Sequence, residues 1–277
     1  MRVRYSFSSR RTRQLKNIRK QKEKYPSLAK KIIQMSDIIL EVLDSRFIKE
    51  TRNIELEKQI ISQGKKIIYV LNKSDLVDTA KLIRRDDILL NPRVFVSCVS
   101  RKGIKGLRDK IKVLVKSIKK PVGKTTVGVI GYPNTGKSSL INSLIGRRSA
   151  GTGADAGFTK GIQKIRLTQE IVLLDSPGII PNKEYSSSES YLISKQTKLG
   201  ARSYSQVKNP EIVVSDLIRE FPDAFDKFYN IQSRGNSEIL IEELGRKKGF
   251  LKKGNCVDED KTARMILRDW QEGKIRN

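Results

Sequence analysis

The sequence predicts an α/β fold with a mostly parallel sheet, followed by a small helical domain and preceded by a basic arm. Between residues 36 and 181, short apolar runs with strand character alternate with helical patterns, an order typical of parallel strands joined by helices. The run at 66–71 is apolar along almost its whole length, as expected of a strand buried on both faces of a sheet. After residue 211, the pattern is helical.

Four regions are expected from these patterns. Residues 1–35 form a basic arm and a short helix, and residues 36–181 form the α/β domain. Residues 182–210 are rich in serine and lysine, which favours a linker. Residues 211–277 form a small helical domain.

The expected strands and helices alternate along the α/β domain. Strands are predicted at 38–44, 66–71, 94–98, 127–130, 163–167 and 171–175. Helices are predicted at 27–36, 52–63, 79–84, 103–118 and 137–146. In the helix over 103–118, Ile104, Leu107 and Ile111 share one face and lysines occupy the other. The final helix is expected to begin after Asp258, a suitable N-cap, and to stop at Gly273.

The composition indicates a protein that binds a polyanion. The 277 residues carry a formal net charge of +27. Residues 1–35 hold twelve Lys or Arg against one acid, and residues 101–124 hold ten against one. Solvated faces are the alternative explanation, but an imbalance of this size favours nucleic acid. The basic runs lack a bulky apolar face, so a membrane surface is disfavoured.

Several classes of protein are disfavoured by what the sequence lacks. It has two cysteines, Cys98 and Cys256, and no histidine, which argues against a disulfide framework and a Cys/His zinc site. No apolar run approaches the ~18 residues of a membrane span. The first residues lack the apolar core of a secretory signal. A reducing, cytoplasmic setting is therefore expected.

A strand, a glycine-containing loop and a helix follow one another in the middle of the sequence. The apolar run at 127–130 ends at Gly131, and Gly136-Lys137-Ser138 follows after four intervening residues. Glycines let backbone N–H groups turn towards phosphates, and the start of a helix adds its positive end. The pattern predicts a phosphate-binding loop, and an ordinary glycine-rich turn is disfavoured because motif and context agree.

This loop assigns roles to individual residues. Lys137 would reach the β- and γ-phosphates, and the Ser138 hydroxyl would ligate Mg²⁺. The sequence therefore predicts a nucleoside triphosphate site with bound magnesium. The expected nucleotide contacts of the loop are Asn134, Thr135, Gly136, Lys137, Ser138 and Ser139.

A second motif predicts which base is bound. Asn72-Lys73-x-Asp75 follows a strand that is expected to be buried. The Asp75 carboxylate can accept from N1–H and from the exocyclic amine of guanine, and adenine offers no such pair of donors. Asn72 would tie this loop to the phosphate loop, and the stem of Lys73 would cover the base. Ser97 and Cys98, at the next strand end, are expected near the guanine oxygen, although a plain strand end has the same pattern.

A third motif predicts how magnesium and the γ-phosphate are sensed. Asp175-x-x-Gly178 follows the strand at 171–175. Asp175 would hold a magnesium-bound water, and the Gly178 N–H would meet the γ-phosphate. Thr159 is the expected switch threonine that ligates Mg²⁺, in preference to Thr152, because it lies closer to the next strand.

The order of these motifs is unusual. The guanine-binding motifs precede the phosphate loop and the magnesium motif, whereas ordinary GTPases have the opposite order. In this respect the chain resembles the circularly permuted GTPases of the YlqF/RbgA type, which assemble the large ribosomal subunit. The resemblance covers about residues 35–181 and the C-terminal helical end. Asp44-Ser45-Arg46 is similar to the family's Asp-Ala-Arg strand end, and Val99 departs from the polar residue of many members.

The resemblance implies a GTP-hydrolysing factor that binds ribosomal RNA and acts in late assembly of the large-subunit precursor. It also implies that residues 211–277 are its RNA- or ribosome-binding domain. Its hydrolysis would be slow alone and stimulated by the ribosomal particle, and a monomer is expected. Two alternatives stay open: a non-catalytic, GTP-regulated RNA-binding scaffold, and a permuted GTPase that acts on the small subunit. Relatives of the latter kind carry an OB-fold and a Cys/His zinc module, which this composition disfavours.

The residue after Gly178 departs from ordinary GTPases. They place a glutamine there to orient the attacking water, but this chain has Ile179, which cannot hydrogen-bond to water. A group from the partner, or a potassium ion held by Asn134 as in the potassium-dependent GTPases that the loop resembles, could replace it. Alternatively, Asn134 only hydrogen-bonds the loop. The residues expected to act in catalysis are Asn134, Lys137, Thr159 and Gly178.

Overall fold

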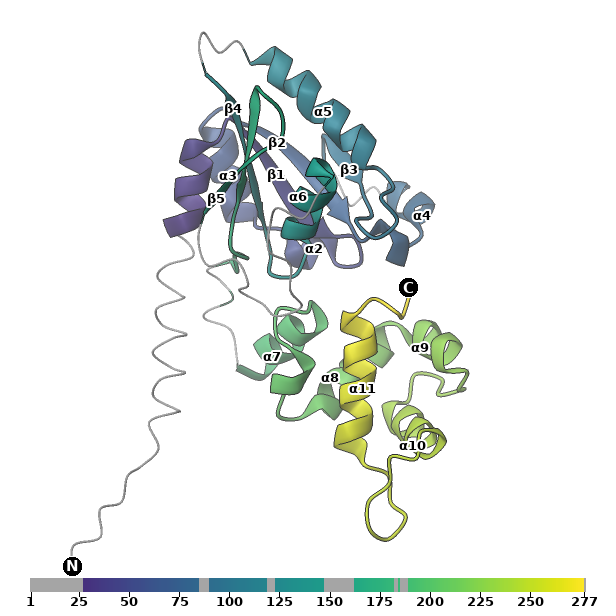
Figure 1. Cartoon of the computed structure of the whole chain (residues 1–277). Helices are drawn as coiled ribbons and strands as arrows, with labels where there is room; N and C mark the ends of the chain where they lie inside the picture. Colours follow the sequence, from purple (N-terminus) through teal and green to yellow (C-terminus); the bar gives the residue numbers. More distant parts are fainter. Residues whose placement is uncertain are drawn as a thin grey trace, which may run out of the picture.

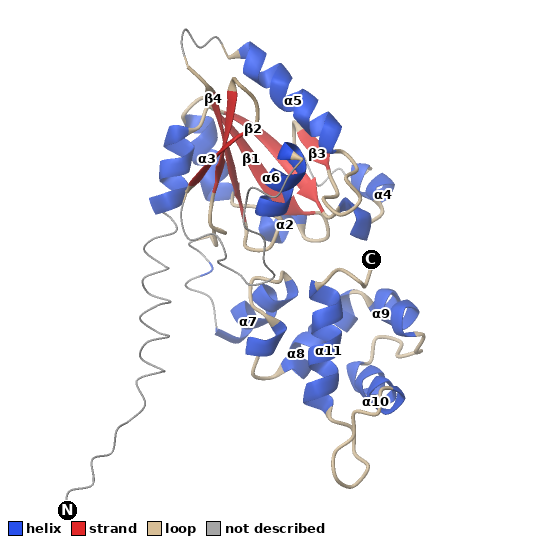
Figure 2. Ribbon diagram, viewed as in Figure 1, coloured by secondary structure: helices blue, strands red, loops and turns tan. Residues whose placement is uncertain are grey.

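A computed structural model describes the protein at residues 27–84, 90–118, 123–146, 162–181, 184 and 189–276. A sheet flanked by helices lies at one end of the molecule, and a group of helices lies at the other (Figure 1). Figure 2 shows that the described strands all belong to the first of these regions. The part of the predicted basic arm at 1–26 lies outside the described residues.

The described strands form one six-stranded sheet in the order β3-β2-β1-β4-β6-β5. Neighbouring strands are parallel, except that β5 runs antiparallel to β6. The predicted α/β fold with a mostly parallel sheet is therefore confirmed. The strands are β1 (Ile38–Asp44), β2 (Lys66–Asn72), β3 (Arg93–Phe95), β4 (Thr125–Gly131), β5 (Gln163–Arg166) and β6 (Ile171–Asp175).

Helices cover both faces of this sheet, which explains why β1 is buried along its whole length. Leu40 of β1 packs with Leu107 and Ile141 on one face. The next residue, Ile39, packs with Ile60 on the other face. The helices of this domain are residues 27–35, α2 (Ile48–Thr51), α3 (Ile54–Ser62), α4 (Thr79–Ile83), α5 (Ile104–Ser117) and α6 (Lys137–Ile145), and η1 (Ser74–Leu76) is a short 3₁₀ turn.

The C-terminal region is helical and has its own apolar core. Trp270 is fully buried in it and stacks on Phe221 and Phe225 at centroid distances of 5.4 and 5.5 Å. Phe47 and Tyr132 of the α/β domain belong to the same core, so apolar contacts join the two domains. The elements are α7 (Glu189–Lys198), η3 (Tyr204–Gln206), α8 (Pro210–Glu220), α9 (Pro222–Tyr229), α10 (Ser237–Lys247) and α11 (Glu259–Gln271).

Local structure differs from expectation at two points. Helix α7 occupies part of the range where serine and lysine favour a linker, because contacts with α8, including Lys198–Glu220, hold it. Strand β3 ends at Phe95 because the chain then turns, and the Ser97 N–H donates to the Lys102 carbonyl. None of the described helices has the length and apolarity needed to cross a membrane.

Candidate functional site

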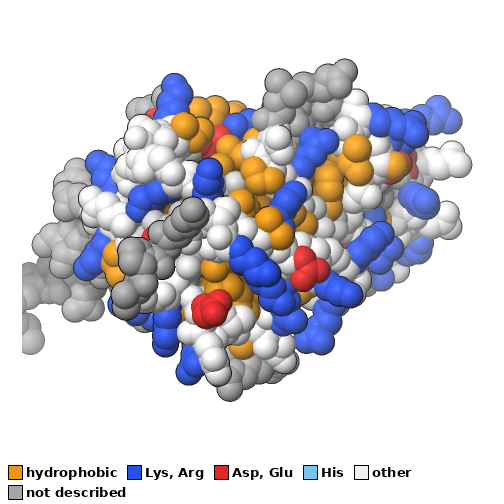
Figure 3. All heavy atoms as spheres, turned by 90° about the horizontal axis from the view of Figure 1, so that it is seen from above, with side chains coloured by type: hydrophobic (Ala, Val, Ile, Leu, Met, Phe, Trp, Pro, Cys, Tyr) orange, Lys and Arg blue, Asp and Glu red, His pale blue; other side chains and the backbone are white. Residues whose placement is uncertain are grey.

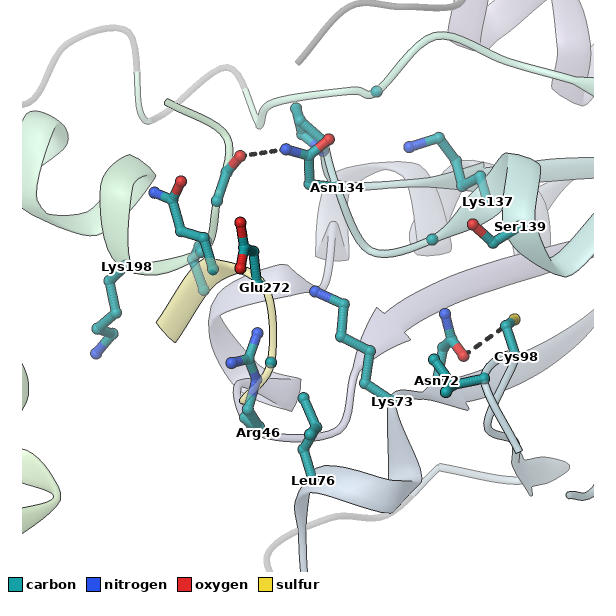
Figure 4. Close-up of a pocket in the computed structure, with 18 of the residues that line it drawn as sticks. Arg46, Asn72, Lys73, Leu76, Cys98, Asn134, Lys137, Ser139, Lys198 and Glu272 are labelled. Atoms are coloured by element: carbon teal, nitrogen blue, oxygen red, sulfur yellow. Dashed lines mark hydrogen bonds between the residues drawn. The ribbon is translucent and has the colours of Figure 1, made fainter. Parts of the chain in front are cut away.

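A cavity of about 710 Å³ lies between the two domains. Residues that follow β1, β2, β4 and β6 line one side of it, and segments of the helical domain line the other. Figure 4 looks into this cavity. Its volume is typical of small-molecule sites, and it lies beyond the carboxyl ends of parallel strands, where ligands of α/β proteins bind.

The loop between β4 and α6 forms the floor of the cavity. Gly136 has a φ of 93°, and a Cβ there would lie only 2.2 Å from Asn72 Nδ2. Only glycine fits this conformation and this close approach. Helix α6 begins at the next residue, Lys137, and both Ser138 and Ser139 line the cavity. The N–H groups of this first helical turn have no partners within the helix, so they suit an anion.

Lys137 is buried and folds back onto its own loop. Its Nζ donates to the carbonyl oxygens of Gly131 at 3.1 Å and Tyr132 at 2.8 Å. Burial lowers the pKa of Lys137 to about 8, and the charge of Asp175 opposes that shift. A bound polyphosphate would stabilise the charged ammonium.

A serine and an aspartate meet beside this lysine. Ser138 Oγ donates to Asp175 Oδ2 at 3.1 Å, and Asp175 is fully buried at the end of β6. Oxygen donors suit Mg²⁺, which takes one or two protein ligands and completes its shell with water and phosphate. The described residues contain no group of three or more His, Cys, Asp or Glu side chains that could hold a metal ion. Thr159, the predicted additional ligand, and Thr152 lie outside the described residues.

The segment after β6 packs directly on the phosphate loop. A Cβ at Gly178 would lie 2.6 Å from Pro133 Cα, so the contact leaves no room for a side chain. The Ile179 N–H donates to the Gly131 carbonyl at 3.0 Å. The Ile179 side chain is buried in an apolar cluster with Ile39. The side chain at the usual glutamine position is therefore directed into the core.

The loop after β2 lies beside the phosphate loop. Asn72 Nδ2 donates to the Thr135 carbonyl at 2.8 Å, and Cys98 Sγ donates to Asn72 Oδ1 at 3.3 Å (Figure 4). In the wall of the cavity, Asp75 Oδ1 is buried and has no hydrogen-bond partner among the described residues. A buried acceptor without a partner is costly, which suits a ligand that brings donors.

Three predicted residues do not line the cavity: Asp175, which accepts from Ser138, and two residues that support these loops from behind. Ser97 is fully buried, and its Oγ accepts from the Ser100 N–H at 3.1 Å. Thr135 is also buried, and its Oγ1 donates to the Tyr132 carbonyl at 3.0 Å. Cys98 does line the cavity, and burial raises the pKa of its thiol.

Asn134 extends from the phosphate loop towards the helical domain. Its Nδ2 donates to the carbonyl oxygen of Gly200. Figure 4 shows its amide oxygen on the opposite side, towards Lys137. The backbone of Asn134 has a φ of 58°, a left-handed conformation that asparagine tolerates better than most residues. This side chain therefore contacts both domains.

No pattern in the sequence marks the side of the cavity that the helical domain provides. Gly200, for example, is 66 residues from Asn134 in the sequence, and no motif marks it. The proximity arises only from the packing of the two domains. The residues that line the cavity from this side include Lys198, Gly200, Arg268, Glu272 and Arg276.

Comparisons with known proteins agree with this geometry. The family described as 50S ribosome-binding GTPase matches residues 126–221. An uncharacterized GTP-binding protein of Methanocaldococcus jannaschii is 41% identical over 252 residues, which make up 90% of this chain and 65% of that protein. The GTPase grn1 of Schizosaccharomyces pombe is 30% identical over 287 residues, and the match covers 91% of this chain and 60% of that protein. The chain spans less than two thirds of both relatives.

A solved structure shows the same fold. GNP-bound YlqF from T. maritima superposes with a TM-score of 0.60 at 25% identity. The match covers 88% of this chain and 92% of that chain. The similarity therefore includes both the α/β domain and the helical region.

The comparisons contradict the cytoplasmic setting that the sequence favours. Relatives include a nucleolar GTP-binding protein 2 of Neurospora crassa and a nuclear GTP-binding protein of Saccharomyces cerevisiae. These names place the first of these relatives in the nucleolus and the second in the nucleus. Composition cannot distinguish the cytoplasm from the nucleus, because a low cysteine content indicates only a reducing compartment and both are reducing.

Proposed function

Because the chain belongs to the circularly permuted GTPases of the YlqF type, we propose that it binds and hydrolyses GTP as a factor in late assembly of the large ribosomal subunit. The observation that carries this proposal is the convergence of three motifs at one cavity. These are the phosphate loop, the Asn72–Asp75 loop and the Asp175–Gly178 segment, whose Asp175 accepts from Ser138 of the phosphate loop. The matched family description and the nucleolar names of relatives support a ribosomal role.

Recognition of the nucleotide would divide between two loops. The Asp75 carboxylate would accept from guanine, and the stem of Lys73 would cover the base. The phosphates would lie at the start of α6 with Lys137. Magnesium, which Ser138 and Asp175 would hold together with Thr159, would neutralise charge on the β- and γ-phosphate oxygens.

Hydrolysis requires a group that replaces the missing glutamine. Asn134 offers an amide oxygen on the side of Lys137, where a potassium ion could supply the positive charge that an arginine finger brings elsewhere. A group from the ribosomal partner is the second possibility. In either case, turnover is expected to be slow alone and faster on the particle.

The proposed partner is ribosomal RNA of the large-subunit precursor. Helix α5 carries exposed Lys105, Lys112 and Lys116, and Arg101 and Lys102 are exposed just before it. Figure 3 shows the face at this end of the molecule, where Lys and Arg side chains are frequent and acidic ones few. Such a face attracts phosphates, and its affinity falls as salt rises.

A turnover assay with purified ribosomal subunits in potassium buffer tests the proposal. We expect slow GTP hydrolysis alone and an increase of at least roughly tenfold with large subunits. The variant Lys137→Ala should remove activity under both conditions. GTP binding without hydrolysis on any particle would favour the non-catalytic scaffold instead. Stimulation by small subunits alone would favour the small-subunit alternative.

A further inference from the structure

A buried group of charges lies at the junction of the two domains, beside the guanine-binding loop. Asp44 ends β1, and its register partner on β2 is Asn72. The Asp44 carboxylate accepts from Arg46 Nε at 3.0 Å and Nη2 at 2.8 Å, and Lys73 Nζ lies 2.7 Å from it. Burial alone would raise the pKa of Asp44, but Lys73 and Arg46 hold it far below its ordinary value. This carboxylate is therefore a fixed negative charge that positions Lys73.

The same arginine contacts the helical domain. Its guanidinium lies 5.0 Å from the centroid of the Trp270 ring and 5.3 Å from that of Phe47. Arg46 Nη1 also approaches the Trp270 carbonyl at 3.4 Å. The Arg46 side chain is only 2% exposed. A planar guanidinium can pair with a carboxylate by its edge and stack by its face, whereas lysine cannot do both.

A second contact joins the guanine-binding loop to the end of α11. A Cβ placed on Gly273 would lie 3.2 Å from Leu76 Cδ1, so Leu76 packs directly on this glycine. Leu76 follows Asp75 in the loop, and Gly273 lies three residues after Trp270. The base side of the cavity therefore meets the helical domain at two adjacent points.

We propose that Arg46 is a positioning residue that makes guanine recognition depend on docking of the helical domain. The inference rests on the proposed binding of guanine nucleotides. When α11 is docked, Arg46 is held between Trp270 and Asp44, and Asp44 fixes Lys73 along the base. When the helical domain moves away, Arg46 loses its stacking partner and the loop loses the contact with Gly273. Because coupling between two equilibria is reciprocal, a bound guanine base stabilises the docked domain by the same free energy.

Trp270 is the single tryptophan of the chain, so its fluorescence reports on this junction. We expect GDP to change Trp270 fluorescence in the wild-type chain. The variant Arg46→Lys keeps a positive charge beside Asp44 but lacks the planar fork. It should lose most of that response and weaken GDP binding roughly tenfold. Binding of pyrophosphate, which has no base, should stay unchanged.

The matched control is Arg52→Lys. Arg52 makes a similar forked pair with Glu57, at 2.9 and 2.7 Å, within the α/β domain. This variant should retain wild-type GDP affinity and the fluorescence response. If Arg46→Lys weakens GDP and pyrophosphate equally, the residue is only structural and the inference is overturned. A wild-type affinity and response in Arg46→Lys would overturn it as well.

A measurement on the wild-type chain covers the case in which Arg46→Lys does not fold. GDP should slow amide hydrogen exchange in α11 around Trp270, and pyrophosphate should not. Equal protection of α11 from exchange by GDP and by pyrophosphate would contradict the coupling. So would the absence of any protection by GDP under conditions in which GDP binds. A wild-type chain that fails to bind GDP at all would instead contradict the proposed function, so the two failures are distinguishable.

Discussion

Replacing Asp75 with asparagine should weaken GTP binding by two to four orders of magnitude. Asp75 Oδ1 is already buried without a partner among the described residues, so guanine would find an acceptor that is desolvated in advance. Each hydrogen bond to a charged group contributes about 1.5–3 kcal/mol, and guanine would donate two. The sum is about 3–6 kcal/mol, and each 1.4 kcal/mol corresponds to tenfold in affinity, which gives roughly 10²- to 10⁴-fold.

The same substitution should improve binding of xanthosine triphosphate, because an asparagine NH₂ can donate to the oxygen that replaces the guanine amine. Calorimetric titration with GTP and with xanthosine triphosphate measures both changes. Asp78→Asn is the control, since the Asp78 side chain caps α4 by accepting from the N–H groups of Ala80 and Lys81. That variant should bind both nucleotides as the wild type does. Unchanged GTP affinity in Asp75→Asn would refute the assignment of the guanine site.

Three further expectations concern ions, RNA and pH. Asn134→Ala should give equal rates of particle-stimulated hydrolysis in potassium and in sodium, and its nucleotide affinity should be retained. Equal rates of the wild-type chain in the two salts would exclude a potassium site. Deletion of residues 1–24, which removes ten basic side chains, should lower the log–log salt slope of RNA binding by about 0.7–0.9 for each lost phosphate contact. Burial and the neighbouring Glu57 raise the pKa of Glu41 in the folded protein above its ordinary value. The wild-type free energy of unfolding should therefore fall as pH rises from the pKa of Glu41 in the unfolded chain through its pKa in the folded protein. Urea unfolding should show Glu41→Gln gaining stability relative to wild type over that window, and a gap independent of pH would contradict the burial of a titrating carboxyl.

The positions of the strands and of the loops that follow them could be predicted from the sequence. Residues 38–44 and 171–175 are short apolar runs that end in an aspartate, and the structure has β1 and β6 over the same ranges. The phosphate loop is equally local, because its strand, glycines and helix lie within about twenty residues of one another. Local patterns of this kind depend on the chemistry of neighbouring residues alone.

The interdomain contacts could not be predicted in this way. Arg46 meets the backbone of Trp270 across 224 residues of sequence, and no periodicity records such a pairing. Tyr132 lies within the phosphate loop, yet it is buried in the core of the helical domain. Helix α7 is not predictable for a related reason: tertiary contacts such as Lys198–Glu220 stabilise a segment whose composition favours a linker.

A structure of the chain with a non-hydrolysable GTP analogue and Mg²⁺ would show directly where the nucleotide binds. We expect guanine against Asp75 and Lys73 and the phosphates at the start of α6, both in the cavity between the domains. The metal should lie at Ser138 and Asp175. A nucleotide bound outside this cavity, or a base that does not contact Asp75, would contradict the proposed site.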